Sequence, residues 1–105
     1  MSATAQPGIG RIVHITSRMA EHLRDSAYAR RIRKMDVLTQ ALHAYYDDPT
    51  GSEYEPQRPM ASRFYVRMSE EETGELEAHA AVSGLAMNEV VRRALAKDMN
   101  ARPNR

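Results

Sequence analysis

Two stretches of the chain alternate apolar and polar residues with a period of two, which predicts two short β-strands. The first covers residues 11–15, and Thr16 or Ser17 caps the helix that follows. The second covers residues 63–68 and divides its side chains between two faces: Phe64, Val66 and Met68 on one, and Arg63, Tyr65 and Arg67 on the other. We expect the apolar face to be buried and the polar face to be exposed.

Each predicted strand is followed by two amphipathic helices. In the second half, Ser69 and Glu72 form a Ser-x-x-Glu capping box that starts a helix with acidic residues at its positive end. Gly84 suits a left-handed C-cap for that helix, and the next helix spans about residues 87–100. The expected inward positions of these two helices are Leu76, Ala80, Leu85, Val90, Val91, Ala94, Leu95 and Met99.

The first half repeats this order, with one helix ending near residue 31 and another spanning about residues 35–46. The inward positions of its second helix are Val37, Leu38, Ala41, Leu42 and Tyr45. Arg31 stands where Gly84 stands in the second half, so we expect the turn between the helices to be built differently.

The two halves match when they are aligned without gaps at an offset of 53 residues, which places 11–47 on 64–100. Six of the 37 pairs are identical and fall on positions with core periodicity: Val13/Val66, Leu23/Leu76, Ala27/Ala80, Val37/Val90, Ala41/Ala94 and Leu42/Leu95. Six more pairs are conservative. Matches concentrated at core positions indicate an internal repeat.

A Pro-rich, acidic segment separates the halves. It contains Pro49, Pro56 and Pro59, and because prolines remove backbone donors and favour extended chain, we interpret it as a linker. The expected organisation is a flexible tail over 1–10, repeat 1 over 11–47, the linker over 48–62, repeat 2 over 63–100 and a tail over 101–105.

Neither half is expected to fold alone, because about 40 residues bury too little apolar surface and a lone strand leaves its backbone unpaired. Pairing the two strands over the four helices removes both problems. We therefore expect an α+β fold with a two-stranded antiparallel ribbon over four helices. The linker, at up to about 50 Å when extended, lets both strands come from one chain. A domain-swapped pair of chains would make the same contacts.

The chain resembles the ribbon-helix-helix DNA-binding family of the Arc/MetJ type at two places, Phe64-Tyr65-Val66-Arg67-Met68-Ser69-Glu70-Glu71 and Gly84-Leu85-Ala86-Met87-Asn88-Glu89-Val90-Val91-Arg92-Arg93-Ala94-Leu95. The resemblance covers residues 63–100 well and 11–47 more weakly. It implies two βαα repeats in one chain that form an intramolecular pseudo-dimer, as in tandem members that include accessory proteins of conjugative plasmids. It also implies that several copies associate along adjacent DNA sites.

In that family the exposed face of the ribbon reads base edges in the major groove. Carried onto this chain, the base-reading residues are Arg63, Tyr65, Arg67, Ile12 and His14, with Gly10 completing the face. Because the first strand offers few hydrogen-bonding groups here, we expect readout to be lopsided and the DNA site asymmetric. The alternative is that this face is only the solvated side of an amphipathic strand.

The family also holds a phosphate with backbone amides at the start of its second helix, as helix N-termini commonly do. The matching positions are Ala86, Met87 and Asn88 in repeat 2, and Arg33, Lys34 and Met35 in repeat 1. Ala86 lacks a hydroxyl cap, which weakens the clamp in repeat 2. In repeat 1 the expected phosphate contacts are the cations Arg30, Arg31, Arg33 and Lys34, although such a run is often only a solvated face.

Fifteen basic and fourteen acidic residues give a formal net charge of +1, which by itself argues against a nucleic-acid partner. The distribution along the chain changes this picture, because residues 1–46 carry +4, residues 47–62 carry −3 and residues 63–105 carry 0. We therefore place the phosphate grip mainly in the first half and the base reading mainly in the second.

Several function classes are disfavoured. Cysteine is absent, the four histidines are expected at the surface or rim without metal-ligand spacing, and no nucleophile or phosphate-loop motif is present. Tyr45 and Tyr46 are expected at the edge of the core. We expect no enzyme, cofactor, metal or small-molecule substrate. No apolar run approaches the roughly 20 residues of a membrane span and residues 1–10 lack a signal-peptide core, so we expect a bacterial cytoplasmic or nucleoid protein.

The leading hypothesis is sequence-specific binding of double-stranded DNA, most simply by a small transcriptional repressor. A relaxosome or partition accessory protein of a mobile element is an alternative role for the same interface. An antitoxin-type module that binds another protein is a further alternative, and the short tails count against it.

Overall fold

The computed structural model describes residues 8–102, and the expected tail residues 1–7 and 103–105 lie outside the described part. The elements follow in the order β1 (Ile9–Ile15), α1 (Ser17–Arg30), α2 (Lys34–Asp47), β2 (Ser62–Met68), α3 (Glu70–Ser83) and α4 (Met87–Ala101). The α+β class, with a two-stranded antiparallel sheet and four helices, is confirmed. Over residues 8–102, no helix has the length and apolar character needed to cross a membrane.

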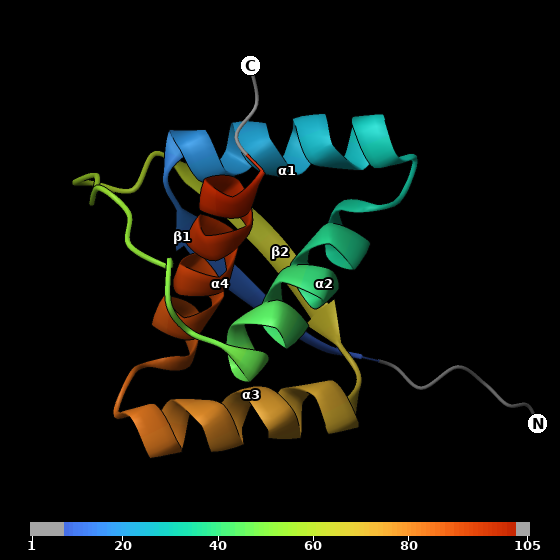
Figure 1. Ribbon diagram of the computed structural model, residues 1–105. Helices are drawn as coiled ribbons and strands as arrows, with labels where there is room; N and C mark the ends of the chain where they lie inside the picture. Colours follow the sequence, from blue (N-terminus) through green and yellow to red (C-terminus); the bar gives the residue numbers. More distant parts are fainter. Residues whose placement is uncertain (1–7, 103–105) are drawn as a thin grey trace, which may run out of the picture.

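The two strands form a ribbon that runs behind the helices. α2 and α4 lie across one face of it, while α1 and α3 lie at opposite ends of the molecule (Figure 1). Along both strands burial alternates with a period of two, as predicted, and the apolar face turns toward the helices. β1 begins earlier than expected because Ile9 and Gly10 pair with Met68 and Arg67 of β2.

The core lies between the ribbon and the helices and draws on every element. Its large, fully buried side chains are Val13, Ile15, Met19, Leu23, Val37, Leu38, Val66, Leu76, Val90, Val91 and Leu95. Burying each such side chain stabilises the fold by about 1.5–3 kcal/mol. Because β1 pairs with β2 and α2 packs on α4, each half supplies the surface that covers the other.

The helix starts follow the predicted caps. Thr16 Oγ1 accepts a hydrogen bond from the Met19 N–H at 3.1 Å, which satisfies one free donor of α1. Ser69 Oγ accepts from the Glu72 N–H at 3.1 Å, and the Glu72 carboxylate accepts from the Ser69 N–H at 2.9 Å. This reciprocal pair is the predicted capping box, and it fixes the direction in which α3 leaves β2.

The expectation that the turn at Arg31 differs from the turn at Gly84 is wrong. Arg31 has φ 59° and ψ 44°, and Gly84 has φ 73° and ψ 23°, so both are left-handed C-caps. The next residue closes each turn in the same way, with Ile32 N–H donating to Ala27 at 3.0 Å and Leu85 N–H to Ala80 at 3.1 Å. Packing of the two helices imposes this turn even where an arginine must adopt the strained conformation.

The expected linker is ordered against α4 and follows that helix before β2 begins (Figure 1). Lys97 Nζ donates to the carbonyl of Thr50 at 2.8 Å, and Asn100 donates to two further linker carbonyls. The Tyr54 hydroxyl donates to the Glu89 carboxylate at 2.8 Å. These contacts hold the connection between the halves in one defined path.

Candidate nucleic-acid interface

The exposed face of the ribbon consists of six outer positions that form three cross-strand pairs: Gly10 with Arg67, Ile12 with Tyr65, and His14 with Arg63. All six residues are exposed, as the sequence pattern predicts. The central pair is apolar and aromatic, with Ile12 49% and Tyr65 55% exposed. The two arginines stand at opposite ends of β2, so the face has an apolar centre between two cationic ends.

Three exposed cations, Arg31, Arg33 and Lys34, lie between the C-cap of α1 and the first residue of α2. The Arg33 side chain is 83% exposed and pairs with Asp36 at 3.1 Å. Hydrogen bonds from the side chain and backbone N–H of Arg33 hold the pKa of Asp36 below its ordinary value. Arg33 is thus oriented by its own helix while its outer surface stays open to solvent.

Arg33 and Arg67 line the same hollow at one end of the ribbon. Together with Gly8, Ser69, Glu72 and other residues they line this hollow of about 530 Å³ between α2, β2 and the start of α3. Antiparallel pairing places the end of β2 alongside the start of β1, and the start of α2 lines the same hollow there. A base-reading candidate from the second half therefore lies beside a phosphate-binding candidate from the first.

The start of α4 is built differently from the start of α2. Ala86 supplies no side-chain hydrogen bond to this cap within the described residues. Instead Arg11 reaches across from β1, and its guanidinium donates to Asn88 Oδ1 at 3.3 Å and lies 3.6 Å from Met87 Sδ. Sequence reasoning missed Arg11, since only the strand register brings it to α4.

Glu89, in the first turn of α4, accepts hydrogen bonds from three side chains. Its carboxylate accepts from Arg92 and Arg93 at 3.0 Å and from the Tyr54 hydroxyl. Burial acts to raise the pKa of Glu89, but these hydrogen bonds outweigh it and the pKa is lowered. Arg92 also donates to the His14 carbonyl at 2.9 Å, which ties α4 to the ribbon.

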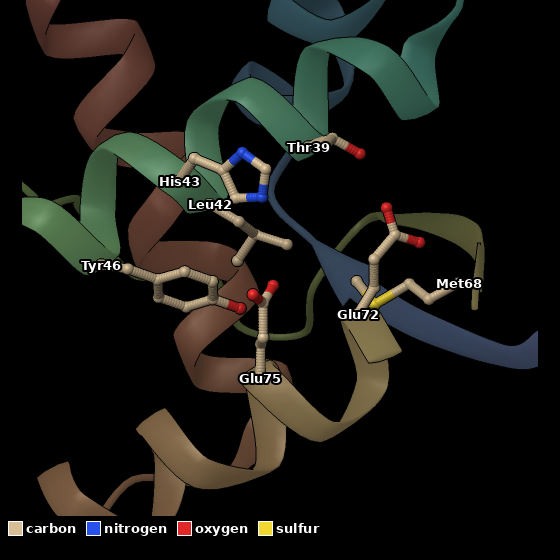
Figure 2. Close-up of a pocket in the computed structure, with 7 residues that line it drawn as sticks. All are labelled: Thr39, Leu42, His43, Tyr46, Met68, Glu72 and Glu75. Atoms are coloured by element: carbon tan, nitrogen blue, oxygen red, sulfur yellow. The ribbon is translucent and has the colours of Figure 1, made fainter. Parts of the chain in front are cut away.

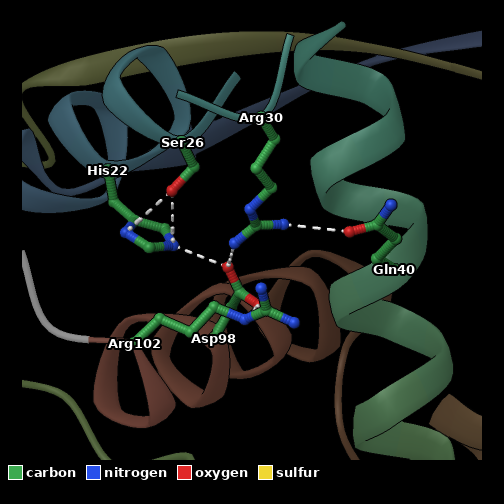
Figure 3. Close-up of polar contacts among 6 residues, drawn as sticks. All are labelled: His22, Ser26, Arg30, Gln40, Asp98 and Arg102. Carbon is green, nitrogen blue, oxygen red and sulfur yellow. Dashed lines mark hydrogen bonds and ion pairs between the residues drawn. The ribbon is translucent and has the colours of Figure 1, made fainter. Parts of the chain in front are cut away.

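Arg30 does not join the other three cations. Its guanidinium donates to Gln40 Oε1 and Asp98 Oδ2, both at 2.9 Å, between α1, α2 and α4 (Figure 3). His22 also belongs to this cluster, 2.7 Å from the same Asp98 oxygen and 4% exposed, so the expectation of a surface histidine is wrong here. Burial acts to raise the pKa of Asp98, but hydrogen bonds from His22 and Arg30 outweigh it and the pKa is lowered.

Ser26, His22 and Asp98 have the residue types of a hydrolase triad without its geometry. Ser26 Oγ lies 3.3 Å from His22 Nε2, the nitrogen that contacts Asp98, and 3.4 Å from Nδ1, so the hydroxyl does not single out the nitrogen opposite the carboxylate. A proton relay needs the hydroxyl and the carboxylate on opposite ring nitrogens. All three residues are also buried, so the cluster serves as a polar joint between α1 and α4.

A small cavity lies between α2 and α3, where Tyr46 and Glu75 face each other below His43 (Figure 2). Its volume is about 10 Å³, which is room for one water molecule at most. Burial, with the nearby Glu75 and Glu72 charges, raises the pKa of Tyr46 to about 12. In the described part of the chain, no group of three or more acidic or histidine side chains is arranged to hold a metal ion.

Comparisons with family models, with curated proteins and with solved structures found no match to this chain.

Proposed function

We propose that this protein binds double-stranded DNA in a sequence-specific manner by laying the exposed face of its ribbon in the major groove. The observation that carries the proposal is that face itself, with Arg63, Tyr65 and Arg67 exposed on a strand whose other side turns toward the core. A two-stranded ribbon fits the width of the major groove, where each base pair presents a distinct pattern of donors and acceptors.

The order of elements supports a tandem ribbon-helix-helix architecture, with the two halves acting as an intramolecular pseudo-dimer. β2, α3 and α4 each begin 53 residues after β1, α1 and α2, the same offset that aligns the sequence halves. The matching left-handed turns at Arg31 and Gly84 add to this support.

The exposed side chains favour a particular chemistry of recognition. Arg63 and Arg67 each suit bidentate hydrogen bonds to guanine, while Ile12 suits a thymine methyl group. The cationic side chains of Arg33 and Lys34 suit a backbone phosphate, while the Arg33 N–H at this helix start already donates to Asp36 at 3.1 Å. Recognition of this kind fits a small repressor that occludes a promoter, and it fits an accessory protein at a mobile-element site equally well.

A titration of fluorescent random-sequence and selected duplexes, followed by anisotropy at several salt concentrations, tests the proposal. Arg67→Ala should relax sequence preference, because it removes a base contact. Arg33→Ala should weaken binding to all sequences alike and reduce the salt slope by about one. Arg24→Ala, an exposed cation on α1, is the matched control for loss of charge. Absence of salt-dependent binding to any duplex would overturn the proposal.

A further inference from the structure

Gly10 of β1, and Gly8 just before that strand begins, leave space that side chains of β2 fill. A β-carbon at Gly10 would collide with the Tyr65 hydroxyl oxygen and lie 2.9 Å from Cζ of the same ring. A β-carbon at Gly8 would lie 2.8 Å from Cγ of Arg67. Tyr65 and Arg67 therefore both lean diagonally across the ribbon, toward the end where α2 begins.

This lean brings Tyr65 and Arg67 into contact. Arg67 Nη1 donates to the Tyr65 hydroxyl at 3.2 Å. An exposed arginine normally samples many rotamers, and ordering it on binding costs free energy. Here the aliphatic part of Arg67 passes over Gly8, and its guanidinium is hydrogen-bonded to the Tyr65 hydroxyl above Gly10. Much of the free-energy cost of ordering Arg67 is therefore met before DNA binds.

The other end of the ribbon lacks these spaces. At the offset of 53 residues, Gly8 and Gly10 correspond to Ala61 and Arg63, which both carry side chains. Arg63 stands opposite His14 there. The two arginines of β2 thus have unlike surroundings, although the period-two pattern places both on the same face.

We infer that Gly10 is a positioning residue that seats Tyr65 over β1 and thereby orients Arg67 as the main discriminating contact with DNA. This inference rests on the proposed function. It predicts an asymmetric target in which a guanine at the Arg67 end, beside Arg33, matters more than a base at the Arg63 end.

The experiment uses duplexes enriched from a random library by the wild-type protein, compared with scrambled duplexes of the same length. Gly10→Ala should reduce the ratio of the two affinities roughly tenfold, about the loss expected for a bidentate guanine contact, and leave affinity for scrambled DNA unchanged. Tyr65→Phe keeps the ring but removes the hydroxyl, so it should lose part of the same ratio. Arg67→Ala should lose more than Arg63→Ala.

Controls separate positioning from loss of fold. The atoms that would collide at Gly10 belong to an exposed side chain, so Tyr65 should move aside and thermal unfolding should change little. Gly74→Ala is the matched glycine control, since a β-carbon there meets nothing within 4 Å, and it should keep full discrimination. In the free protein, nuclear Overhauser contacts between Gly10 Hα and the Tyr65 ring should show that the ring lies over Gly10 before DNA binds.

The outcomes are distinguishable. Failure of the wild type to enrich any sequence would overturn the proposed function and this inference with it. An enriched site that Gly10→Ala still discriminates, or the absence of Gly10–Tyr65 contacts in the free protein, would overturn this inference alone. Equal losses for Arg63→Ala and Arg67→Ala would do the same.

Discussion

The contact between α1 and α4 is built from charged side chains, whereas the contact between α3 and α2 is built from aromatic rings. Asp98 joins α4 to α1 through a buried cluster with His22 and Arg30. At the offset of 53 residues Asp98 corresponds to Tyr45, whose ring packs on His79 of α3 with centroids 5.1 Å apart. Two helix contacts at positions 53 residues apart in the sequence thus differ in chemistry.

The ionic contact and the aromatic contact depend on different interactions for their stability. A buried ion cluster stabilises only while every charge keeps its partner, because an unpaired buried charge is costly. An aromatic pair depends mainly on buried area and shape, and it tolerates loss of a polar atom. The comparison therefore predicts unequal sensitivity to small changes.

Near-isosteric substitutions should produce the largest difference. Asp98→Asn leaves Arg30 and His22 without their carboxylate and should lower the free energy of unfolding by about 3–5 kcal/mol. Tyr45→Phe keeps the ring and should cost about 1 kcal/mol or less. Urea unfolding at neutral pH measures both. Equal losses would show that the two contacts do not differ in the way described.

The pH dependence sharpens the same comparison. The folded-state pKa of Asp98 lies below its ordinary value of 3.8, so its contribution is present above that value and is lost as pH falls through the folded-state pKa. The stability difference between wild type and Asp98→Asn should therefore shrink as pH falls below about 4. The difference between wild type and Tyr45→Phe should stay constant. Thermal unfolding across this pH range tests both, and parallel curves for Asp98→Asn would contradict the assignment.

The two inter-helix turns give the smallest expected effects. Arg31→Gly relieves a left-handed arginine and should stabilise the protein by about 0.5–1 kcal/mol, while Gly84→Ala should destabilise it by about 1 kcal/mol. Unfolding curves of the two variants should move in opposite directions. A shift of both in the same direction would mean that the turns are not equivalent.

The local features of the fold were predictable because they depend on neighbours in sequence. The period-two alternation of residues 63–68, the Ser69–Glu72 box and the glycine cap at Gly84 are all encoded within a few positions. The first-half turn was mispredicted because Arg31 has no preference for its conformation. Packing of α1 and α2 over the shared core imposes it.

The candidate site was predictable only in part. Alternation identifies the exposed positions of each strand, and these are the residues proposed to read DNA. It does not show that Arg67 lies beside Arg33, that Arg11 reaches Asn88, or that Arg30 is held by Asp98. Each of these pairs of residues is more than 30 positions apart in the sequence, so no local pattern contains the pairing.

The sequence alone determined the order of elements, the buried and exposed faces and the uneven distribution of charge, since these follow from periodicity and residue type. The tertiary structure decided which charges became structural and which remained exposed. The physical reason is register: antiparallel pairing of β1 with β2 places Gly10 beneath Tyr65 and the end of β2 beside the start of α2. Gly10, which the sequence pattern only placed on the exposed face, thereby lies under the exposed pair of Tyr65 and Arg67.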